Sequence, residues 1–252
     1  MTTPISVQLY SLRREAAHDF GAVLERIAGI GFVGVETAGL HGMDPGVFAK
    51  RVADLGLVVS SAHIPLPLGA DAERVLDEQE AVGNSLVISG LGPEDFATDA
   101  AIAASAERFS QAAAQARRRG MTLGYHNHWW EFATTPAVVD PMGRFLSLVD
   151  PAVFLEVDIY WLQASGRDPV ATLRELGSRV RMLHVKDGPC THTDPMVAVG
   201  QGDVDVAAIL PAAASTGWHI VELDECATDM FDAVHASYDY LVGAGLSRGR
   251  VA

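Results

Sequence analysis

The chain has 252 residues, of which 49% are hydrophobic and 20% are charged, and its formal net charge is −14 with histidine counted as neutral. This composition is typical of a soluble globular protein with enough apolar material for a sizeable core. Because nucleic acids and anionic membranes are recognised by cationic side chains, the charge argues against DNA, RNA and membrane lipids as partners.

Cysteine usage and the N-terminal sequence indicate the cellular compartment in which we expect the protein. The two cysteines, Cys190 and Cys226, are far apart and have no metal-binding spacing, so we expect no structural disulfide and a reducing compartment. The N-terminus has no basic leader, and no apolar run approaches the roughly 20 residues that a membrane span requires. We therefore expect a cytoplasmic protein.

Strand-like runs alternate with helical segments along the chain. The first run, Ile5 to Tyr10, alternates apolar and polar residues, and from Asp19 to Ile30 apolar residues recur at helical spacing. The predicted strands span residues 5–10, 32–36, 57–63, 85–89, 121–126, 153–158, 180–185 and 218–223. The predicted helices span residues 19–30, 44–55, 71–82, 98–119, 136–148, 169–178, 205–216 and 229–243.

Eight strand–helix units in about 250 residues are typical of a (β/α)₈ barrel, the TIM barrel. The rival α/β fold, a doubly wound sheet, would need a glycine-rich phosphate turn after its first strand to bind a dinucleotide, and residues 8–12 contain no glycine. No linker or low-complexity tract divides the chain. We predict a single TIM-barrel domain over residues 1–252.

The predicted strands end in side chains that bind metals. TIM-barrel enzymes carry their chemistry at these C-terminal ends. Imidazole and carboxylate groups together suit Mn²⁺, Co²⁺, Zn²⁺ or Fe²⁺ better than Ca²⁺, and such an ion acidifies the C–H bond beside a carbonyl. Strand by strand, the end residues are Gln8, Glu36, His63, Ser89, His126 with His128, Glu156 with Asp158, His184 with Lys186, and Glu222 with Asp224.

Several of these residues have a structural interpretation beside the functional one. Glu222 ends an apolar run, where an unpaired carboxylate is costly, so we interpret it as functional. Glu156 and Asp158 point to the same side of their strand, and Asp158, nearer the strand end, is the expected ligand. His184 is either a ligand or a hydrogen-bonded core histidine. Lys186 binds a substrate oxygen or forms a salt bridge with a neighbouring aspartate.

The remaining candidates are more open. His63 and Glu36 suit substrate contact and a structural role equally well. Tryptophans near the strand ends could stack on a sugar or pack in the core; these are Trp129, Trp130 and Trp161. Four histidines lie away from the strand ends and are expected at the surface: His18, His41, His192 and His235.

Short motifs follow one another in a recognisable order from the first predicted strand to the eighth. They are Gln8-Leu-Tyr-Ser-Leu-Arg13, Gly34-Val-Glu36, Tyr125-His-Asn-His with Glu131-Phe132, Glu156-Val-Asp-Ile-Tyr-Trp161, His184-Val-Lys-Asp187 and Val221-Glu222. In order and spacing they resemble the xylose isomerase-like superfamily, and more closely its sugar phosphate isomerase/epimerase family.

The resemblance implies a TIM barrel with a divalent metal, often Mn²⁺, held by a Glu, an Asp, a His and a Glu from strands five to eight. The last three positions fall on Asp158, His184 and Glu222. At the first position this sequence departs, because the family's usual Glu-Asn-His appears as His126-Asn127-His128. His126 is then either a ligand in place of Glu or a base beside the metal, and Glu131 is the alternative ligand.

The departure also alters the expected chemistry. Family epimerases use two metal-bound glutamates to exchange protons on the two faces of an enediolate. Here a histidine and a glutamate would share that task. The expected catalytic residues are His126, Glu222, Glu131 and Glu156. The expected substrate contacts are Glu36, His63, His128, Trp161 and Lys186.

We therefore predict a metal-dependent isomerase or epimerase that removes a proton α to the carbonyl of a sugar, keto-sugar or cyclitol, with or without a phosphate. Mn²⁺ is the expected ion, with Co²⁺, Zn²⁺, Mg²⁺ and Fe²⁺ as alternatives. The runner-up is a lyase or dehydratase that uses the same site for β-elimination on a keto-sugar, keto-glycoside or inosose. A non-catalytic sugar-binding barrel is a third candidate. The net charge and the tryptophan at position 161 both argue against an abasic-site endonuclease. A homo-oligomer is one expected form of assembly.

Overall fold

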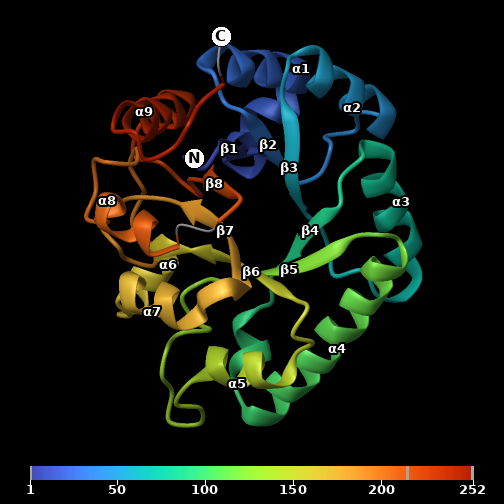
Figure 1. Ribbon diagram of the computed structural model, residues 1–252, viewed down its shortest axis with the longest axis vertical. Helices are drawn as coiled ribbons and strands as arrows, with labels where there is room; N and C mark the ends of the chain where they lie inside the picture. Colours follow the sequence, from blue (N-terminus) through green and yellow to red (C-terminus); the bar gives the residue numbers. More distant parts are fainter. Residues whose placement is uncertain (1, 214–215, 251–252) are drawn as a thin grey trace.

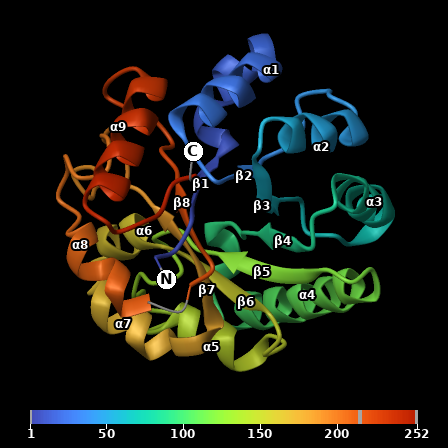
Figure 2. The same cartoon turned by 45° about the horizontal axis from the view of Figure 1, so that its top comes forward.

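Eight parallel strands close into a barrel in the order β1 to β8, and the helices form a ring around it (Figure 1 and Figure 2). This computed structural model describes residues 2–213 and 216–250. The strands are β1 (Ile5–Gln8), β2 (Gly34–Thr37), β3 (Val58–His63), β4 (Leu86–Ser89), β5 (Thr122–His126), β6 (Phe154–Asp158), β7 (Val180–Val185) and β8 (Trp218–Val221). The predicted TIM barrel is confirmed.

The helical segments include the crossovers between strands and several short turns. The α-helices are α1 (Arg13–Ile30), α2 (Pro45–Asp54), α3 (Ala72–Val82), α4 (Asp99–Arg118), α5 (Pro141–Leu148), α6 (Ile159–Ala164), α7 (Pro169–Leu176), α8 (Val206–Ile209) and α9 (Met230–Gly243). The 3₁₀ helices are η1 (Leu9–Leu12), η2 (Gly69–Asp71), η3 (Pro93–Phe96), η4 (Gly177–Arg179) and η5 (Leu210–Ala213).

The inside of the barrel is apolar at one end and polar at the other. Side chains two residues apart share one side of a strand, so Phe154 lies beneath Glu156 in β6. In the same way Met182 lies beneath His184, and Ile220 lies beneath Glu222. Phe154, Met182 and Ile220 form a separate buried cluster with Ile88, called here the apolar plug. This plug leaves the opposite, C-terminal end of the barrel to polar side chains.

Two segments differ from the prediction near the N-terminus. Strand β1 ends at Gln8, because its side chain accepts a hydrogen bond from Tyr10 N and the chain turns into η1. Helix α1 begins at Arg13 instead of Asp19. Asp19 nevertheless has non-helical dihedral angles (φ −153°, ψ 89°), and its Oδ1 accepts from Ala22 N at 2.9 Å. The predicted helix start at Asp19 was therefore wrong, and Asp19 marks a kink inside α1.

Three further boundaries differ. Helix α5 starts at Pro141 instead of residue 136, because Asp140 provides its N-cap. The short helix α6, which was not predicted, is capped by Asp158, whose Oδ1 accepts from Trp161 N at 2.9 Å. The helix predicted over 205–216 consists of α8 and the 3₁₀ helix η5, and residues 214–215 lie outside the described residues.

One buried aspartate organises the long loop after β7. Asp187 accepts hydrogen bonds from four backbone N–H groups, those of Gly188, Gly200, Gly202 and Val204, at 2.8 to 3.0 Å. A Cβ at Gly202 would lie 2.3 Å from Asp187 Oδ1, so this glycine permits the close approach. The loop is thereby fastened to the end of the strand that carries His184.

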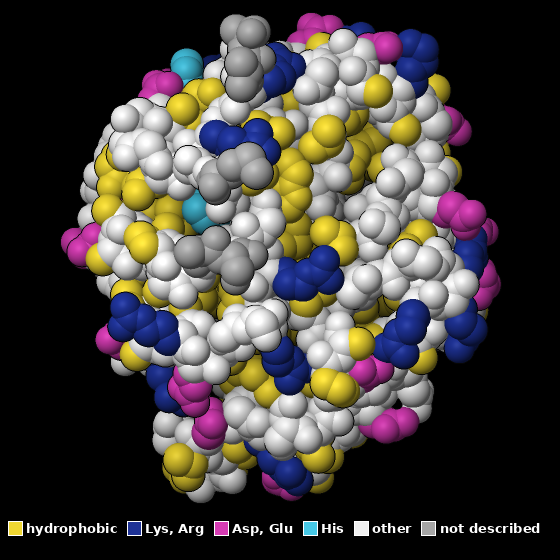
Figure 3. Space-filling model, viewed as in Figure 1, with side chains coloured by type: hydrophobic (Ala, Val, Ile, Leu, Met, Phe, Trp, Pro, Cys, Tyr) yellow, Lys and Arg dark blue, Asp and Glu magenta, His cyan; other side chains and the backbone are white. Residues whose placement is uncertain are grey.

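The face shown in Figure 3 is mixed in character. On the face shown in Figure 3, Lys and Arg side chains are scattered among acidic and apolar ones. Within the described ranges no helix is long and apolar enough to cross a membrane. Cys190 and Cys226 are free thiols, as predicted.

The apolar plug predicts a steric requirement for glycine in β5. A Cβ at Gly124 would lie 2.5 Å from Phe154 Cζ and 2.8 Å from Ile88 Cδ1. We expect Gly124→Ala to lower the free energy of unfolding by about 1–3 kcal/mol through overpacking, measured by urea denaturation. The matched control is Gly29→Ala in α1, where nothing lies within 4 Å of the added methyl. Equal stability of the two variants would contradict this account of the plug.

A second prediction concerns pH. His219 in β8 is 4% exposed, and burial lowers its pKa from 6.5 to about 4. As pH falls, the unfolded chain takes up this proton before the folded one does. The contribution of neutral His219 to the free energy of unfolding is therefore fully present above about pH 6.5 and decreases towards pH 4. We expect wild type to lose about 2 kcal/mol more than His219→Gln between pH 7 and pH 5. Urea unfolding at both pH values tests this, and parallel losses in the two proteins would refute it.

Candidate active site

The C-terminal end of the barrel brings the predicted ligands together. Two overlapping groups of His, Asp and Glu each place one ligand atom per residue within 4.8 Å of the others. The first group, called here the carboxylate-rich group, is His126, Asp158, His184 and Glu222. The second, called the nitrogen-rich group, is His63, His126, Glu156 and His184. The four ligands expected from sequence are those of the carboxylate-rich group.

His184 lies between carboxylates on both sides of its ring. Its Nδ1 is 2.7 Å from Glu222 Oε2, and its Nε2 is 2.7 Å from Glu36 Oε1 and 3.1 Å from Glu156 Oε2. Burial lowers the pKa of His184, but the charges of Glu156, Glu222 and Glu36 outweigh it and raise this pKa well above its usual value. The imidazole is therefore protonated unless a metal cation replaces one of its protons.

Glu36 is oriented by its neighbours on β1 and β3. Its Oε1 accepts from Gln8 Nε2 at 2.6 Å, and its Oε2 accepts from the Ser61 hydroxyl. Burial, followed by the charge of Glu156, raises the pKa of Glu36 to about 7. The predicted substrate contact is thus a fully buried carboxyl that is committed to hydrogen bonds within the protein.

Lys186 neutralises the acidic side of the site. Its Nζ is 2.7 Å from Glu222 Oε2, 3.0 Å from Asp158 Oδ2 and 2.9 Å from Asp224 Oδ2. Burial lowers the pKa of Lys186, yet these carboxylates outweigh burial and raise it well above its usual value. The salt-bridge interpretation of Lys186 is confirmed, with Asp158 and Asp224 both involved.

Glu156 is the centre of the nitrogen-rich group. Its Oε2 is 2.6 Å from His63 Nε2 and 3.3 Å from His126 Nδ1. Burial raises the pKa of Glu156, but the neighbouring His184 and His63 hold it well below its usual value. The other oxygen, Oε1, is buried and has no hydrogen-bond partner among the described residues.

His126 differs from the other imidazoles. Burial, together with the charge of His184, lowers its pKa well below the usual value. Its Nδ1 is buried and makes no well-aligned hydrogen bond within the described residues. His126 is therefore a neutral imidazole, and its Nδ1, 3.3 Å from Glu156 Oε2, is not committed to an aligned hydrogen bond.

Glu131 positions the loop after β5 and belongs to neither group. Its Oε1 accepts from Tyr125 Oη at 2.7 Å, and its Oε2 accepts from His128 N at 2.8 Å. Asn127 joins this loop to the next strand, because its Oδ1 accepts from Asp158 N at 3.0 Å. The Tyr125-His-Asn-His motif is thus held from both sides.

Aromatic rings cover the region around these loops. His128 stacks on Trp130 with ring centroids 4.2 Å apart, and Trp129 stacks on His192 at 3.9 Å. The Trp161 ring centroid lies 5.6 Å from Lys186 Nζ. The four histidines expected at the surface, His18, His41, His192 and His235, are exposed.

The site opens through a pocket of about 270 Å³. Its lining comprises Tyr10, Ala38, His63, Gly90, His126, His128, Lys186, Glu222 and Asp224. Tyr10 was missed because the sequence placed it inside the first strand. It is 43% exposed, and the Arg13 guanidinium lies 4.1 Å from its ring centroid. The signal that could have found it is its position just beyond the ligand-bearing strand end.

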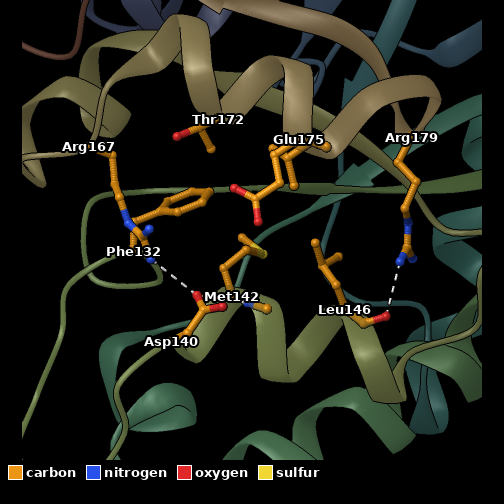
Figure 4. Close-up of a pocket in the computed structure, with 10 residues that line it drawn as sticks. Phe132, Asp140, Met142, Leu146, Arg167, Thr172, Glu175 and Arg179 are labelled. Atoms are coloured by element: carbon orange, nitrogen blue, oxygen red, sulfur yellow. Dashed lines mark hydrogen bonds and ion pairs between the residues drawn. The ribbon is translucent and has the colours of Figure 1, made fainter.

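A cavity of similar volume lies outside the barrel, between α5 and α7 (Figure 4). Arg167 and Asp140 form an ion pair at one end of it, 3.2 Å apart. Its walls include Phe132, Met142 and Leu146. It contains none of the predicted site residues, so we place the chemistry in the barrel pocket.

The chain belongs to the xylose isomerase-like TIM barrel family, because that family model matches residues 24–225. An inosose dehydratase from Erwinia tasmaniensis is 26% identical over 194 residues, 68% of this chain and 64% of that protein. One from Clostridium tetani is 25% identical over 130 residues, 44% of this chain and 43% of that protein. The chain thus matches less than two thirds of the length of these relatives.

Solved structures show the same fold. A sugar phosphate isomerase/epimerase from Parabacteroides distasonis has a TM-score of 0.83 with 23% identity, covering 98% of this chain and 96% of that one. An L-ribulose 3-epimerase has a TM-score of 0.73 with 18% identity, covering 97% and 94%. At these identities the likeness establishes the barrel.

Charge compensation by Lys186 predicts a stability effect. Lys186→Met would leave the buried Asp158 and Glu222 without their ammonium partner, so we expect a loss of about 3–5 kcal/mol in the free energy of unfolding. The control is Lys50→Met, because Lys50 is exposed and pairs with Asp54 on the helix surface; there we expect at most about 0.5 kcal/mol. Urea denaturation compares the two, and equal losses would contradict the assigned role of Lys186.

Proposed function

We propose that this protein is a divalent-metal-dependent isomerase or epimerase that removes a proton α to the carbonyl of a sugar or keto-sugar. The observation that carries the proposal is the carboxylate-rich group, which is buried at the C-terminal end of the barrel and borders an open pocket. This is the end at which TIM-barrel enzymes carry their chemistry.

The residues fit a divalent ion. Two imidazoles and two carboxylates, in or directly after four successive strands, converge on one point, and this donor set suits Mn²⁺ and related ions. His126 Nδ1 is buried and without an aligned hydrogen bond among the described residues, and Asp158 Oδ2 is buried against the Lys186 ammonium at 3.0 Å. A ligating histidine usually donates its other ring N–H to a carboxylate, and Glu36 is in place to accept from His184 Nε2.

The assigned roles follow from the contacts. Asp158, His184, Glu222 and His126 would hold the ion, which would polarise the substrate carbonyl and acidify the adjacent C–H bond. Neighbouring cations outweigh burial and hold the pKa values of Glu156 and Glu222 well below the usual one. Both carboxylates are therefore ionised, and they are the first candidate bases. His126, whose imidazole is neutral, is the second candidate base where it does not hold the ion.

Substrate positioning involves the pocket lining. His63 and His128 reach the pocket with partly exposed side chains, so both are suited to bind hydroxyl groups. Lys186 carries a permanent positive charge beside Glu222, which favours an oxygen on which negative charge develops. Glu131 orients His128 through the backbone. Trp161, whose ring centroid lies 5.6 Å from Lys186 Nζ, is suited to position that ammonium.

The second candidate function is a lyase or dehydratase on a keto-sugar or inosose. The observation in its favour is the sequence similarity to inosose dehydratases over 68% of this chain. Both reactions begin with removal of the same α proton. They differ in whether the resulting enolate is reprotonated or expels a β-hydroxyl group.

Deuterium exchange tests the proposal. We expect that the protein with Mn²⁺, incubated in D₂O with a ketopentose, a ketohexose and an inosose in turn, labels the C–H beside the carbonyl of one of them. NMR detects the label, and the product separates epimerisation from elimination. Chelation should stop the exchange, and Mn²⁺ should restore it.

The matched control is Asp158→Asn, which keeps the shape of the side chain but removes its charge. We expect it to abolish the exchange while the far-ultraviolet circular dichroism stays unchanged. If exchange continues after chelation, or if Asp158→Asn exchanges at the wild-type rate, the metal-dependent reaction is wrong. Absence of exchange with every substrate class and with Mn²⁺, Co²⁺, Zn²⁺, Mg²⁺ and Fe²⁺ would favour a non-catalytic barrel.

A further inference from the structure

The nitrogen-rich group places three imidazole nitrogens around one carboxylate oxygen. The Oε2 atom of Glu156 is 2.6 Å from His63 Nε2, 3.1 Å from His184 Nε2 and 3.3 Å from His126 Nδ1. A carboxylate oxygen has two lone pairs, so it cannot accept aligned hydrogen bonds from all three. The other oxygen, Oε1, is buried without a partner in the described part of the chain. Three imidazoles and one carboxylate are a donor set that a divalent metal cation binds.

The orientation of His184 allows it to serve either group, one at a time. A neutral imidazole has one N–H and one lone pair. With the lone pair on Nδ1, beside Glu222, the Nε2–H donates to Glu36 at 2.7 Å. With the lone pair on Nε2, which faces Glu156 at 3.1 Å, the Nδ1–H donates to Glu222. Each tautomer therefore offers a ligand to one group and has a carboxylate to accept its proton.

The two groups differ in donor chemistry and in electrostatic competition. The carboxylate-rich group offers two imidazoles and two carboxylates, and both carboxylates, Asp158 and Glu222, contact the Lys186 ammonium. The nitrogen-rich group offers three imidazoles and one carboxylate, and the ion pairs of Lys186 within the described ranges include none of its members. Imidazole suits Zn²⁺, whereas carboxylate suits Mn²⁺.

We propose that Zn²⁺ binds the nitrogen-rich group, and that this position excludes an ion from the carboxylate-rich group because the two share His126 and His184. The inference rests on the proposed function, which assigns the Mn²⁺-type ion to the carboxylate-rich group. His63 lines the pocket and its side chain is 24% exposed, so the ion enters from the substrate side. Zn²⁺ at this position displaces Mn²⁺.

The test compares the affinities of two ions across matched variants. Zn²⁺ is titrated in competition with a chromophoric chelator, and Mn²⁺ is titrated by electron paramagnetic resonance of the free ion. We expect His63→Gln and Glu156→Gln to weaken Zn²⁺ at least about tenfold and to leave Mn²⁺ within about twofold. We expect Asp158→Asn to do the reverse. Each ion should bind wild type once per chain, and Zn²⁺ should release bound Mn²⁺.

The control is His235→Gln, which removes an exposed histidine from α9 and should change neither affinity. If Zn²⁺ affinity is unchanged in both His63→Gln and Glu156→Gln, or if Asp158→Asn weakens the two ions equally, one position serves both and the inference is wrong. Simultaneous binding of one Zn²⁺ and one Mn²⁺ would overturn the exclusion. Failure of wild type to bind either ion would refute the proposed function itself, a result distinct from these.

Discussion

The structure of the site depends on compensation between buried charges. Glu36, Glu156 and Asp158 are fully buried and Glu222 nearly so, and an isolated carboxylate in such a place would be very costly. Two buried cations are shared among them. His184 contacts Glu36, Glu156 and Glu222, and Lys186 contacts Asp158 and Glu222. Glu222 links the two sets, so the position of each member depends on the others.

The same compensation separates the pKa values of chemically similar groups. Burial and the charge of Glu156 raise the pKa of Glu36 to about 7. In contrast, His184 and His63 outweigh burial and hold the pKa of Glu156 well below its usual value. The pKa of His126 is lowered, whereas the pKa of His184 is raised. A site with ionised carboxylates beside a neutral imidazole is prepared for proton transfer. The apolar plug of Phe154 and its neighbours keeps these groups at the open end of the barrel.

By the resemblance drawn from the sequence, His126 stands where a glutamate is expected. An imidazole in place of a carboxylate lowers the negative charge of the carboxylate-rich group and adds a nitrogen donor to the other. It lies 3.3 Å from Glu156 through Nδ1, so the replacement ties the two groups together. Family membership therefore establishes the barrel, while the contacts at the centre of the site are those of this sequence.

The fold and the position of several site residues could be predicted from the sequence. The alternation of strand and helix patterns determined the barrel, because each strand–helix unit is a local pattern. Asp158, His184 and Glu222 could be placed at one rim because the C-terminal ends of barrel strands meet there. The boundaries of α1 and α5 were less accessible, since the Asp19 and Asp140 caps compete with neighbouring signals of similar strength.

Only the tertiary structure decided the partners of these residues. Glu131 bonds to Tyr125 and to the backbone of His128, and Lys186 bridges three carboxylates from different parts of the chain. Tyr10 became a pocket residue because η1 turns it out of the strand direction. Sequence patterns report which side of an element a residue occupies. Distances and pKa shifts depend on how closed strands bring remote side chains together, and that is a property of the whole barrel.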